Sequence, residues 1–534
     1  RSPVRIDLLQ DGPDGPALVL NIAAGTADDG EYIWIPGNSG IDFGTHGLRI
    51  QVSLVHDAHV LDRSQENFSV PEDGGEYYVD DGSNSGDAYT PGAIGSNRHT
   101  GKTALAPKPN PVNLLREYTL DSFSTLHVDT GDYPMIYSVT VSGSVDMGLG
   151  LDEGFLMTGP TNTAVAATLF PAIPGDRTRA LIELNDADFV TINHLSLRDA
   201  DRGLYVRNGS DAFAASWITA WGHDQDGIWI DSLAPFNTLS HLTAYNNTRY
   251  GILVDGDLAA FTQSLAYGNG NVGIYTTGGV DLFTDNTAHD NQSWGFYLNQ
   301  PGDSQILRNE SYGNRHGMLV SNGTGMAWVG STDLAAGNGN RIHDNSFVGL
   351  SVQSAGVHAA GNAVWGHTAV NQTGLQASSG AQASYNLVYD NYHGLAIGNG
   401  GFANYNRVYG NLGTGIDASY ASLTGNVVYS NAQGVTWSGA GGYTLRNNLI
   451  YGNSLGGLAI SGNGLQVFNN SVAQDAGNAV SINNVSNIRL VNNILWAGAG
   501  YGLAVSSNSQ VGFESDYNLF YTTGPALVGQ WQGV

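Results

Sequence analysis

The stretch Tyr409-Gly410-Asn411, followed by Gly415-Ile416-Asp417-Ala418, decides the fold. An aromatic residue, a spacer and an Asn precede a Gly, and the Gly opens a short run in which apolar and polar residues alternate. The same arrangement recurs at Tyr267-Gly268-Asn269 and at Tyr451-Gly452-Asn453. Short alternating runs that are broken by Gly, Asn and Ser indicate strands and turns in place of helices.

The Asn position repeats through the chain at intervals of mostly about 20 to 24 residues, a period typical of a stacked solenoid. The positions are His223, Asn247, Asn269, Asn291, Asn314, Asn345, His367, Asn391, Asn411, Asn431, Asn453 and Asp475. Coils stacked about 4.8 Å apart place these side chains one above another, so their amides are expected to hydrogen-bond along a ladder. The pattern predicts an all-β chain, a parallel β-helix. His223, His367 and Asp475 are either substituted rungs of this ladder or functional residues. The Gly that follows most rungs suits a turn with positive φ.

Composition indicates an extracellular protein and restricts its partners. The chain has 73 Gly, no Cys, 13% charged residues and a net charge of −27, a combination typical of extracellular repeat proteins. Zero Cys excludes disulfides and thiolate metal sites. Lys102 and Lys108 are the only lysines, so no basic patch for nucleic acid or anionic membrane is expected, and no apolar run is long enough to span a membrane. Partners should be neutral, cationic or bridged by a cation.

Three regions are predicted. Residues 1–70 contain alternating segments parted by turns, including Glu31-Tyr32-Ile33-Trp34-Ile35, and should form a small antiparallel β-sandwich. Residues 71–125 should form a linker and a helical cap, because the segment from Pro111 to Tyr118 begins with Pro and has helical spacing. Residues 126–534 should form the β-helix, whose first coil the helix covers.

The chain also resembles a known group. The stretch from Tyr78 to Gly82, the helix and coils such as Asn447 to Asn453 resemble right-handed parallel β-helix proteins of the pectate-lyase-like superfamily. More closely, they resemble the β-helix segments of very large bacterial surface proteins, in which small immunoglobulin-like sandwiches precede the helix. That superfamily contains polysaccharide lyases, glycoside hydrolases, epimerases, phage tailspikes, adhesins and fibre proteins, so the resemblance implies an architecture and leaves the activity open.

The strand after each Gly points alternate side chains outward. On the early coils the outward pairs are Tyr205 and Arg207, Trp229 and Asp231, Leu253 and Asp255, Tyr275 and Thr277, and Tyr297 and Asn299. Exposed aromatic rings on adjacent coils mark an interaction site and suit sugar rings. Tyr205, Trp229, Tyr275, Tyr297 and Asn299 are therefore the predicted glycan-binding residues.

A catalytic alternative uses the same face. Asp231 and Asp255 should lie one rung apart, about 5 Å, which is the separation that retaining glycosidases use for nucleophile and acid. Arg207 would then bind a carboxylate or keep one Asp ionised. A third hypothesis gives these residues a purely architectural role, since solenoid faces commonly carry stacked like residues and an Arg beside two Asp balances charge.

An acidic loop gives a candidate metal site. Asp80, Asp81, Asn84 and Asp87 offer oxygen ligands suited to calcium, which an acidic extracellular protein would meet. The spacing departs from that of the EF-hand loop, and an acidic turn without a metal is the alternative.

The sequence thus predicts a secreted or cell-surface protein, a structural or adhesive module of a fibre or matrix, with glycan binding on its early coils. Its partners would be a polysaccharide or cell-surface glycan, and further copies stacked end to end, because no capping helix is predicted before Val534. The alternative function is a polysaccharide hydrolase or lyase.

Overall fold

The computed structural model describes residues 2–12, 15–28, 32, 34, 47–65, 67–68, 75–143, 154–162, 166–231, 237–321 and 325–531. The chain divides into two compact units. Unit 1 comprises Arg1–Ala200 and Leu204–Ile218, and unit 2 comprises Asp201–Gly203 and Thr219–Val534.

Unit 1 begins with an antiparallel sheet in the order β2-β1-β3-β4. Its strands are β1 (Val4–Gly12), β2 (Gly15–Thr26), β3 (Leu48–Leu54) and β4 (Asp57–Arg63). Leu8 and Leu48 are fully buried between them. The predicted antiparallel segment is therefore confirmed, and its described residues form one sheet. The predicted strand from Glu31 to Ile35 lies mostly outside the described residues.

The predicted helix is present as α1 (Pro111–Leu115). The side chain of Asn110 caps it by accepting a hydrogen bond of 3.0 Å from the backbone N–H of Asn113, and Pro at the first position is compatible with this start. Before the helix, β5 (Gly75–Val79) already pairs in parallel with β6 (Ser124–Val128). The first parallel rung thus lies inside the segment expected to be linker and cap.

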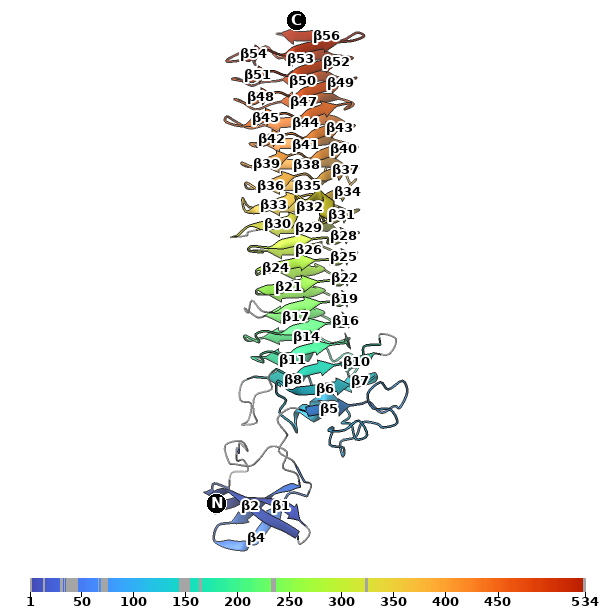
Figure 1. The fold of residues 1–534 in the computed structure, drawn as a ribbon, viewed down its shortest axis with the longest axis vertical. Coiled ribbons are helices and arrows are strands. Elements are labelled where there is room, and N and C mark those ends of the chain that lie inside the picture. The colour runs from blue at the N-terminus through green and yellow to red at the C-terminus, as the bar shows by residue number, and fades with distance from the viewer. Residues whose placement is uncertain are drawn as a thin grey trace. The chain divides into compact units, whose positions relative to one another are not determined.

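The other strands of unit 1 are short and parallel to their neighbours in the coils (Figure 1). They are β7 (Gly131–Met135), β8 (Val139–Ser142), β9 (Leu156–Thr158), β10 (Ala167–Pro171), β11 (Ala180–Asn185), β12 (Thr191–Asn193), β13 (Leu195–Arg198) and β15 (Ala214–Ser216). The unit boundary falls within β14 (Arg202–Arg207).

Unit 2 is a right-handed parallel β-helix in which each coil contributes one strand to each of three sheets. Sheet I contains β16 (Thr219–Trp221), β19 (Thr243–Tyr245), β22 (Leu265–Tyr267), β25 (Thr287–His289), β28 (Glu310–Tyr312), β31 (Arg341–His343), β34 (Ala363–Trp365), β37 (Leu387–Tyr389), β40 (Arg407–Tyr409), β43 (Val427–Tyr429), β46 (Leu449–Tyr451), β49 (Ser471–Gln474), β52 (Ile494–Ala497) and β55 (Leu519–Thr522).

Sheet II contains β17 (Ile228–Asp231), β20 (Ile252–Asp255), β23 (Ile274–Thr276), β26 (Trp294–Asn299), β29 (His316–Ser321), β32 (Leu350–Gln353), β35 (Thr373–Ser378), β38 (His393–Gly398), β41 (Thr414–Ser419), β44 (Gln433–Ser438), β47 (Gly456–Ile460), β50 (Asn478–Ile482), β53 (Tyr501–Val505) and β56 (Leu527–Trp531).

Sheet III contains β18 (Thr238–Ser240), β21 (Leu258–Thr262), β24 (Val280–Thr284), β27 (Gln305–Leu307), β30 (Ala327–Gly330), β33 (Val357–Ala360), β36 (Gln382–Ser384), β39 (Phe402–Asn404), β42 (Ser422–Thr424), β45 (Thr444–Arg446), β48 (Gln466–Phe468), β51 (Arg489–Val491) and β54 (Glu514–Asp516). A 3₁₀ turn, η2 (Leu334–Ala336), follows β30. The predicted fold, a parallel β-helix with a small antiparallel sheet before it, is confirmed.

The core follows from the alternation along each strand. In sheet I the central residue of each strand points inward, and Val364, Val388, Val408, Val428 and Ile450 are each at most 1% exposed on successive rungs. Because identical positions stack, branched apolar side chains fill the interior as continuous columns.

The predicted ladder is present and buried. Asn247 donates from Nδ2 to Oδ1 of Asn269 at 3.0 Å, and Asn269 donates to Asn291 at 2.9 Å. His223 and His367 are fully buried and take positions in this ladder. The prediction for Asp475 is wrong: Gln474 accepts the hydrogen bond from the backbone N–H of Asn453 at 2.9 Å, because its longer side chain reaches inward while Asp475 is exposed.

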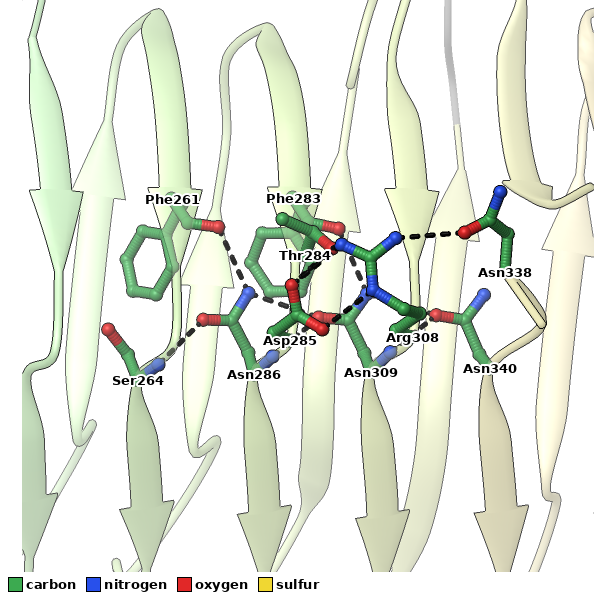
Figure 2. Close-up of polar contacts among 10 residues, drawn as sticks. All are labelled: Phe261, Ser264, Phe283, Thr284, Asp285, Asn286, Arg308, Asn309, Asn338 and Asn340. Atoms are coloured by element: carbon green, nitrogen blue, oxygen red, sulfur yellow. Dashed lines mark hydrogen bonds and ion pairs between the residues drawn. The ribbon is translucent and has the colours of Figure 1, made fainter. Parts of the chain in front are cut away.

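A second Asn ladder, which the sequence analysis missed, lies between sheets III and I (Figure 2). Asn286 donates to Oδ1 of Asn309 at 3.0 Å, and Asn309 donates to Oδ1 of Asn340 at 3.0 Å. The ladder continues through Asn362, Asn386, Asn406, Asn426, Asn448, Asn470, Asn493 and Asn518. Its members precede those of the first ladder by five residues wherever both are Asn, as in Asn286 and Asn291. That spacing was the available signal.

The glycines after the ladder do not have positive φ, so this prediction is wrong. A Cβ added at Gly251 would lie 2.6 Å from the carbonyl oxygen of Gly273 and 2.7 Å from Nδ2 of Asn269. Gly is therefore required there by the close approach of the ladder. Positive φ occurs instead just before the ladder residue, as at Gly268 (φ 64°) and Asp290 (φ 57°).

The aromatic residue of the repeat forms a stack of rings along the outer face of sheet I. Neighbouring ring centroids are 4.4 to 5.7 Å apart and neighbouring planes differ by 3 to 9°. The rings are those of Trp221, Tyr245, Tyr267, His289, Tyr312, His343, Trp365, Tyr389, Tyr409, Tyr429 and Tyr451. Because the rings cover one another's faces, this stack stabilises the coils and offers a sugar only ring edges.

Candidate functional site

Sheet II places the predicted residues of unit 2 on neighbouring rungs. Asp231 is in register with Asp255, and Tyr275 is in register with Tyr297. The residues between them, such as Ile230 and Val254, are fully buried, so the alternation turns the aromatic and charged side chains outward. The structure thus brings these predicted residues to one face of the β-helix.

Two guanidinium groups lie close to the ring of Trp229. Cζ of Arg202 is 4.8 Å and Cζ of Arg249 is 5.7 Å from its ring centroid. Asp226 is fully buried, and its Oδ atoms accept from Nε and Nη2 of Arg249 at 2.8 and 2.6 Å. Its Oδ2 is also 3.6 Å from Nε of Arg202, whose Nη1 donates to Oδ2 of Asp201. This network fixes the indole and adds cations to an otherwise acidic face.

The tyrosines of the same sheet contact one another. The rings of Tyr275 and Tyr297 stack at 4.8 Å with planes 28° apart, and Tyr250 meets Tyr275 edge-on at 5.5 Å. Asn299, at the end of β26, accepts a hydrogen bond of 3.3 Å from the hydroxyl of Ser321. All are half-buried except Ser321, which is buried. The group presents phenol and amide edges to solvent.

The two predicted carboxylates have different environments. Asp231 is exposed at the end of β17, and its pKa is raised by partial burial of the carboxyl group and by the charge of Asp255. Asp255 is half-buried and accepts a short hydrogen bond from the hydroxyl of Thr277. The pair therefore holds one carboxyl group whose pKa is raised beside one that accepts a hydrogen bond from a hydroxyl.

The other two residues predicted for the site, Tyr205 and Arg207, belong to unit 1 and are described within it. Nη2 of Arg207 is paired with Oε1 of Glu183 at 2.5 Å, and its Cζ lies 5.7 Å from the ring centroid of Tyr205. The predicted role of Arg207 toward Asp231 stays a prediction, whereas its ion pair with Glu183 is a contact that the sequence analysis did not anticipate.

Two residues of this face were missed from the sequence: Arg202 and Arg249. Both lie, like Asp226, at or just before the start of the sheet II strand of their coil, outside the outward positions that the strand alternation selects. The available signal was the interval of 23 residues between Asp226 and Arg249, about one coil, which puts the two on adjacent rungs.

The predicted metal residues separate into two groups. Oxygen atoms of Asp80, Asp87 and Asp129 lie within 4.8 Å of one another. Asp81 instead accepts hydrogen bonds from the backbone N–H groups of Ser83 at 2.7 Å and Asp132 at 3.0 Å, and Asn84 is exposed. Asp129, which the sequence analysis did not select, thus joins two of the four predicted residues.

Parts of the chain match two family models. Residues 171–377 match the model described as "Periplasmic copper-binding protein (NosD)", and residues 417–528 match "Right handed beta helix region". The comparison with curated proteins returns no match. No helix in the described ranges is long and apolar enough to cross a membrane.

Several solved structures are distantly similar. The A-module of the Azotobacter vinelandii mannuronan C-5 epimerase AlgE6 is 15% identical, with 76% of this chain and 90% of that chain covered and a TM-score of 0.26. Pectate lyase Pel9A is 12% identical (76% and 80% covered, TM-score 0.23), and the catalytic domain of a GH87 α-1,3-glucanase in complex with tetrasaccharides is 10% identical (99% and 87%, TM-score 0.27). The strand register and the two family models together identify the chain as a right-handed parallel β-helix protein.

Proposed function

We propose that the protein is a structural and adhesive module located outside the cytoplasm, at the cell surface or secreted, which binds a neutral or amino-substituted glycan along sheet II. The observation that carries this proposal is the alignment of Trp229, Tyr275 and Tyr297 with Asp231 and Asp255 on successive rungs. Rungs are about 4.8 Å apart, similar to the length of one sugar ring, so each rung can meet one residue of an extended glycan.

Electrostatics and architecture support the same proposal. The chain carries a net charge of −27, which disfavours polyanionic glycans, while carboxylates and phenols hydrogen-bond sugar hydroxyls. Two buried amide ladders and a stack of aromatic rings give a rigid scaffold suited to a fibre or matrix. The partial match to a family described as periplasmic supports a location outside the cytoplasm.

The test of glycan binding is calorimetric titration of the full chain with neutral and amino-substituted oligosaccharides, against an oligogalacturonate. Trp229→Ala is expected to weaken binding about tenfold, which corresponds to ~1.4 kcal/mol. Trp217→Ala is the matched control, because Trp217 is 46% exposed and lies outside sheet II. An equal loss in both variants, or binding of the oligogalacturonate alone, would contradict the proposal.

A polysaccharide hydrolase is the second candidate, and the Asp231 and Asp255 pair favours it. Two adjacent carboxylates in unequal environments are the arrangement that separates an acid from a base or nucleophile. Under our proposal the wild-type protein releases no reducing sugars from the polysaccharides that it binds. Release that is abolished in both Asp231→Asn and Asp255→Asn, and retained in Asp281→Asn on the exposed side of β24, would establish the hydrolase instead.

A further inference from the structure

Three carboxylates of unit 1 converge at one edge of the first parallel pair of strands. Val79 of β5 is in register with Val128 of β6, so Asp80 and Asp129, the next residues, leave adjacent rungs at the same edge. Asp87 reaches them from the loop after β5, and one oxygen atom of each carboxylate lies within 4.8 Å of the others.

Two of these carboxylates are buried without hydrogen-bond partners. Both Oδ atoms of Asp80 and both Oδ atoms of Asp87 are inaccessible and have no partner among the described residues. Asp80 is 0% exposed as a whole residue. Buried carboxylates are normally paired, so oxygen atoms of this kind point to a missing positive charge.

Asp129 has a different role. Its Oδ1 accepts from the backbone N–H groups of Ala88 and Thr130 at 2.7 and 2.6 Å. Its Oδ2 accepts from the N–H groups of Tyr89 and Thr90, at 2.9 and 2.6 Å, and from the Thr90 hydroxyl at 2.6 Å. These donors keep Asp129 ionised and hold the loop that carries Asp87.

Within the described part of the chain, no Lys, Arg or His forms an ion pair with any of the three carboxylates. The buried Lys108 lies beside Asp80, whose backbone N–H donates to the Lys108 carbonyl at 2.9 Å. Its Nζ instead pairs with Oε1 of Glu117 at 2.6 Å and donates to the Asn97 carbonyl at 3.2 Å. Burial, followed by the charges of Asp87, Asp129 and Asp81, raises the pKa of Asp80 to about 7. The backbone N–H of Asp81 opposes this increase without reaching hydrogen-bonding geometry.

We propose that Asp80 and Asp87 bind a calcium ion beside the ionised Asp129, and that this ion ties the loop of residues 81–90 to the first rungs of the β-helix. Calcium accepts carboxylate oxygens in flexible geometry and keeps water ligands, whereas magnesium requires a near-ideal octahedron. The group contains no imidazole or thioether, which copper favours. The site is independent of the glycan surface.

The direct test uses the full chain after removal of metals with a chelator. Tb³⁺ emission sensitised by the nearby Tyr89 and Tyr133 should appear on titration and be displaced by Ca²⁺, with calorimetry giving one Ca²⁺ per chain. Asp80→Asn and Asp87→Asn are each expected to weaken Ca²⁺ binding at least tenfold. Asp281→Asn, an exposed Asp outside the group, should bind as the wild type does.

Hydrogen exchange distinguishes a calcium site from the alternative in which Asp80 and Asp87 share a proton and bind no metal. With Ca²⁺ bound, the amides of residues 88–90 should exchange at least tenfold more slowly than in chelator. Asp80→Asn removes repulsion, so it should slow their exchange in chelator and abolish the response to Ca²⁺. The proposal would be overturned if about 10 mM Ca²⁺ did not slow exchange in the wild type. It would also be overturned if Ca²⁺ slowed exchange in Asp80→Asn as much as in the wild type.

Discussion

Replacement of Asn309 by alanine is expected to lower the free energy of unfolding of the β-helix by roughly 3–5 kcal/mol. Asn309 is 0% exposed. Its Oδ1 accepts from the backbone N–H and from Nδ2 of Asn286, both at 3.0 Å, and its Nδ2 donates to the Phe283 carbonyl at 2.9 Å and to Asn340 at 3.0 Å (Figure 2). Alanine leaves the buried backbone N–H of Asn286 without its acceptor and removes a donor from the Phe283 carbonyl. It also takes one of two partners from Nδ2 of Asn286 and from Oδ1 of Asn340, which keep their hydrogen bonds to the Phe261 carbonyl and to the backbone N–H of residue 309.

The measurement for Asn309→Ala is guanidinium unfolding followed by circular dichroism, with hydrogen exchange to locate the weakened coils, since long repeats need not unfold in two states. Asn404→Ala is the control. Asn404 ends β39, is half-buried, and its side chain has no hydrogen bond among the described residues, so its replacement should change the free energy of unfolding by less than about 0.5 kcal/mol. Equal effects of the two replacements would show that the ladder adds no stability.

Acidification should destabilise unit 2 through His367 by about 3 kcal/mol between pH 6.5 and 4. Burial lowers the pKa of His367 from 6.5 to about 4, against the opposing hydrogen bond to Asn391. Its ring nitrogens lie 2.8 Å from Oδ1 of Asn391 and 3.2 Å from Nδ2 of Asn345, so the neutral ring donates to one amide and accepts from the other.

The sign follows from proton uptake. Below pH 6.5 His367 is protonated in the unfolded chain, whereas in the folded chain it stays neutral until about pH 4. The free energy of unfolding therefore falls between pH 6.5 and about 4, and the contribution of His367 is constant below that. His367→Asn restores an amide rung and should remove this part of the slope, measured as the free energy of unfolding against pH. His59→Asn, at an exposed position, should leave it unchanged. If the free energy of unfolding of His367→Asn fell with pH as steeply as that of the wild type, the pH dependence would come from other groups.

The sequence predicts the coil well because each rung repeats the same physical requirement. An inward amide, a small residue beneath it and an alternating strand recur together, so the first ladder was readable from Asn269, Asn411 and Asn453. The second ladder was missed because only one Asn of each repeat was compared between coils, although Asn448 and its equivalents also recur once per coil. Gly251 shows a second limit of the sequence. A Gly that recurs in every coil can reflect either positive φ or a close approach of a neighbouring group, and only the positions of its neighbours distinguish the two.

Sites were harder to predict because they depend on residues that do not repeat. The strand alternation put Trp229, Asp231 and Asp255 on one face, yet it gave no sign that Asp226 would be buried close to two arginines. The acidic loop was found from its composition. Asp129 could not be added to it, because its position depends on the pairing of β5 with β6 across the intervening loop and helix.

The parallel rungs also determine how unit 2 would respond to mechanical force. The hydrogen bonds that join successive coils point along the axis of the β-helix, so tension between its ends loads one rung at a time, as in a zipper. A coil of 22 residues, such as that from Asn247 to Asn269, occupies about 4.8 Å of the axis but releases roughly 75 Å of extended chain. Under tension along this axis, each coil would lengthen about fifteenfold as it unfolds, so the module would extend in small steps. These steps would absorb work before any attachment at its ends had to break.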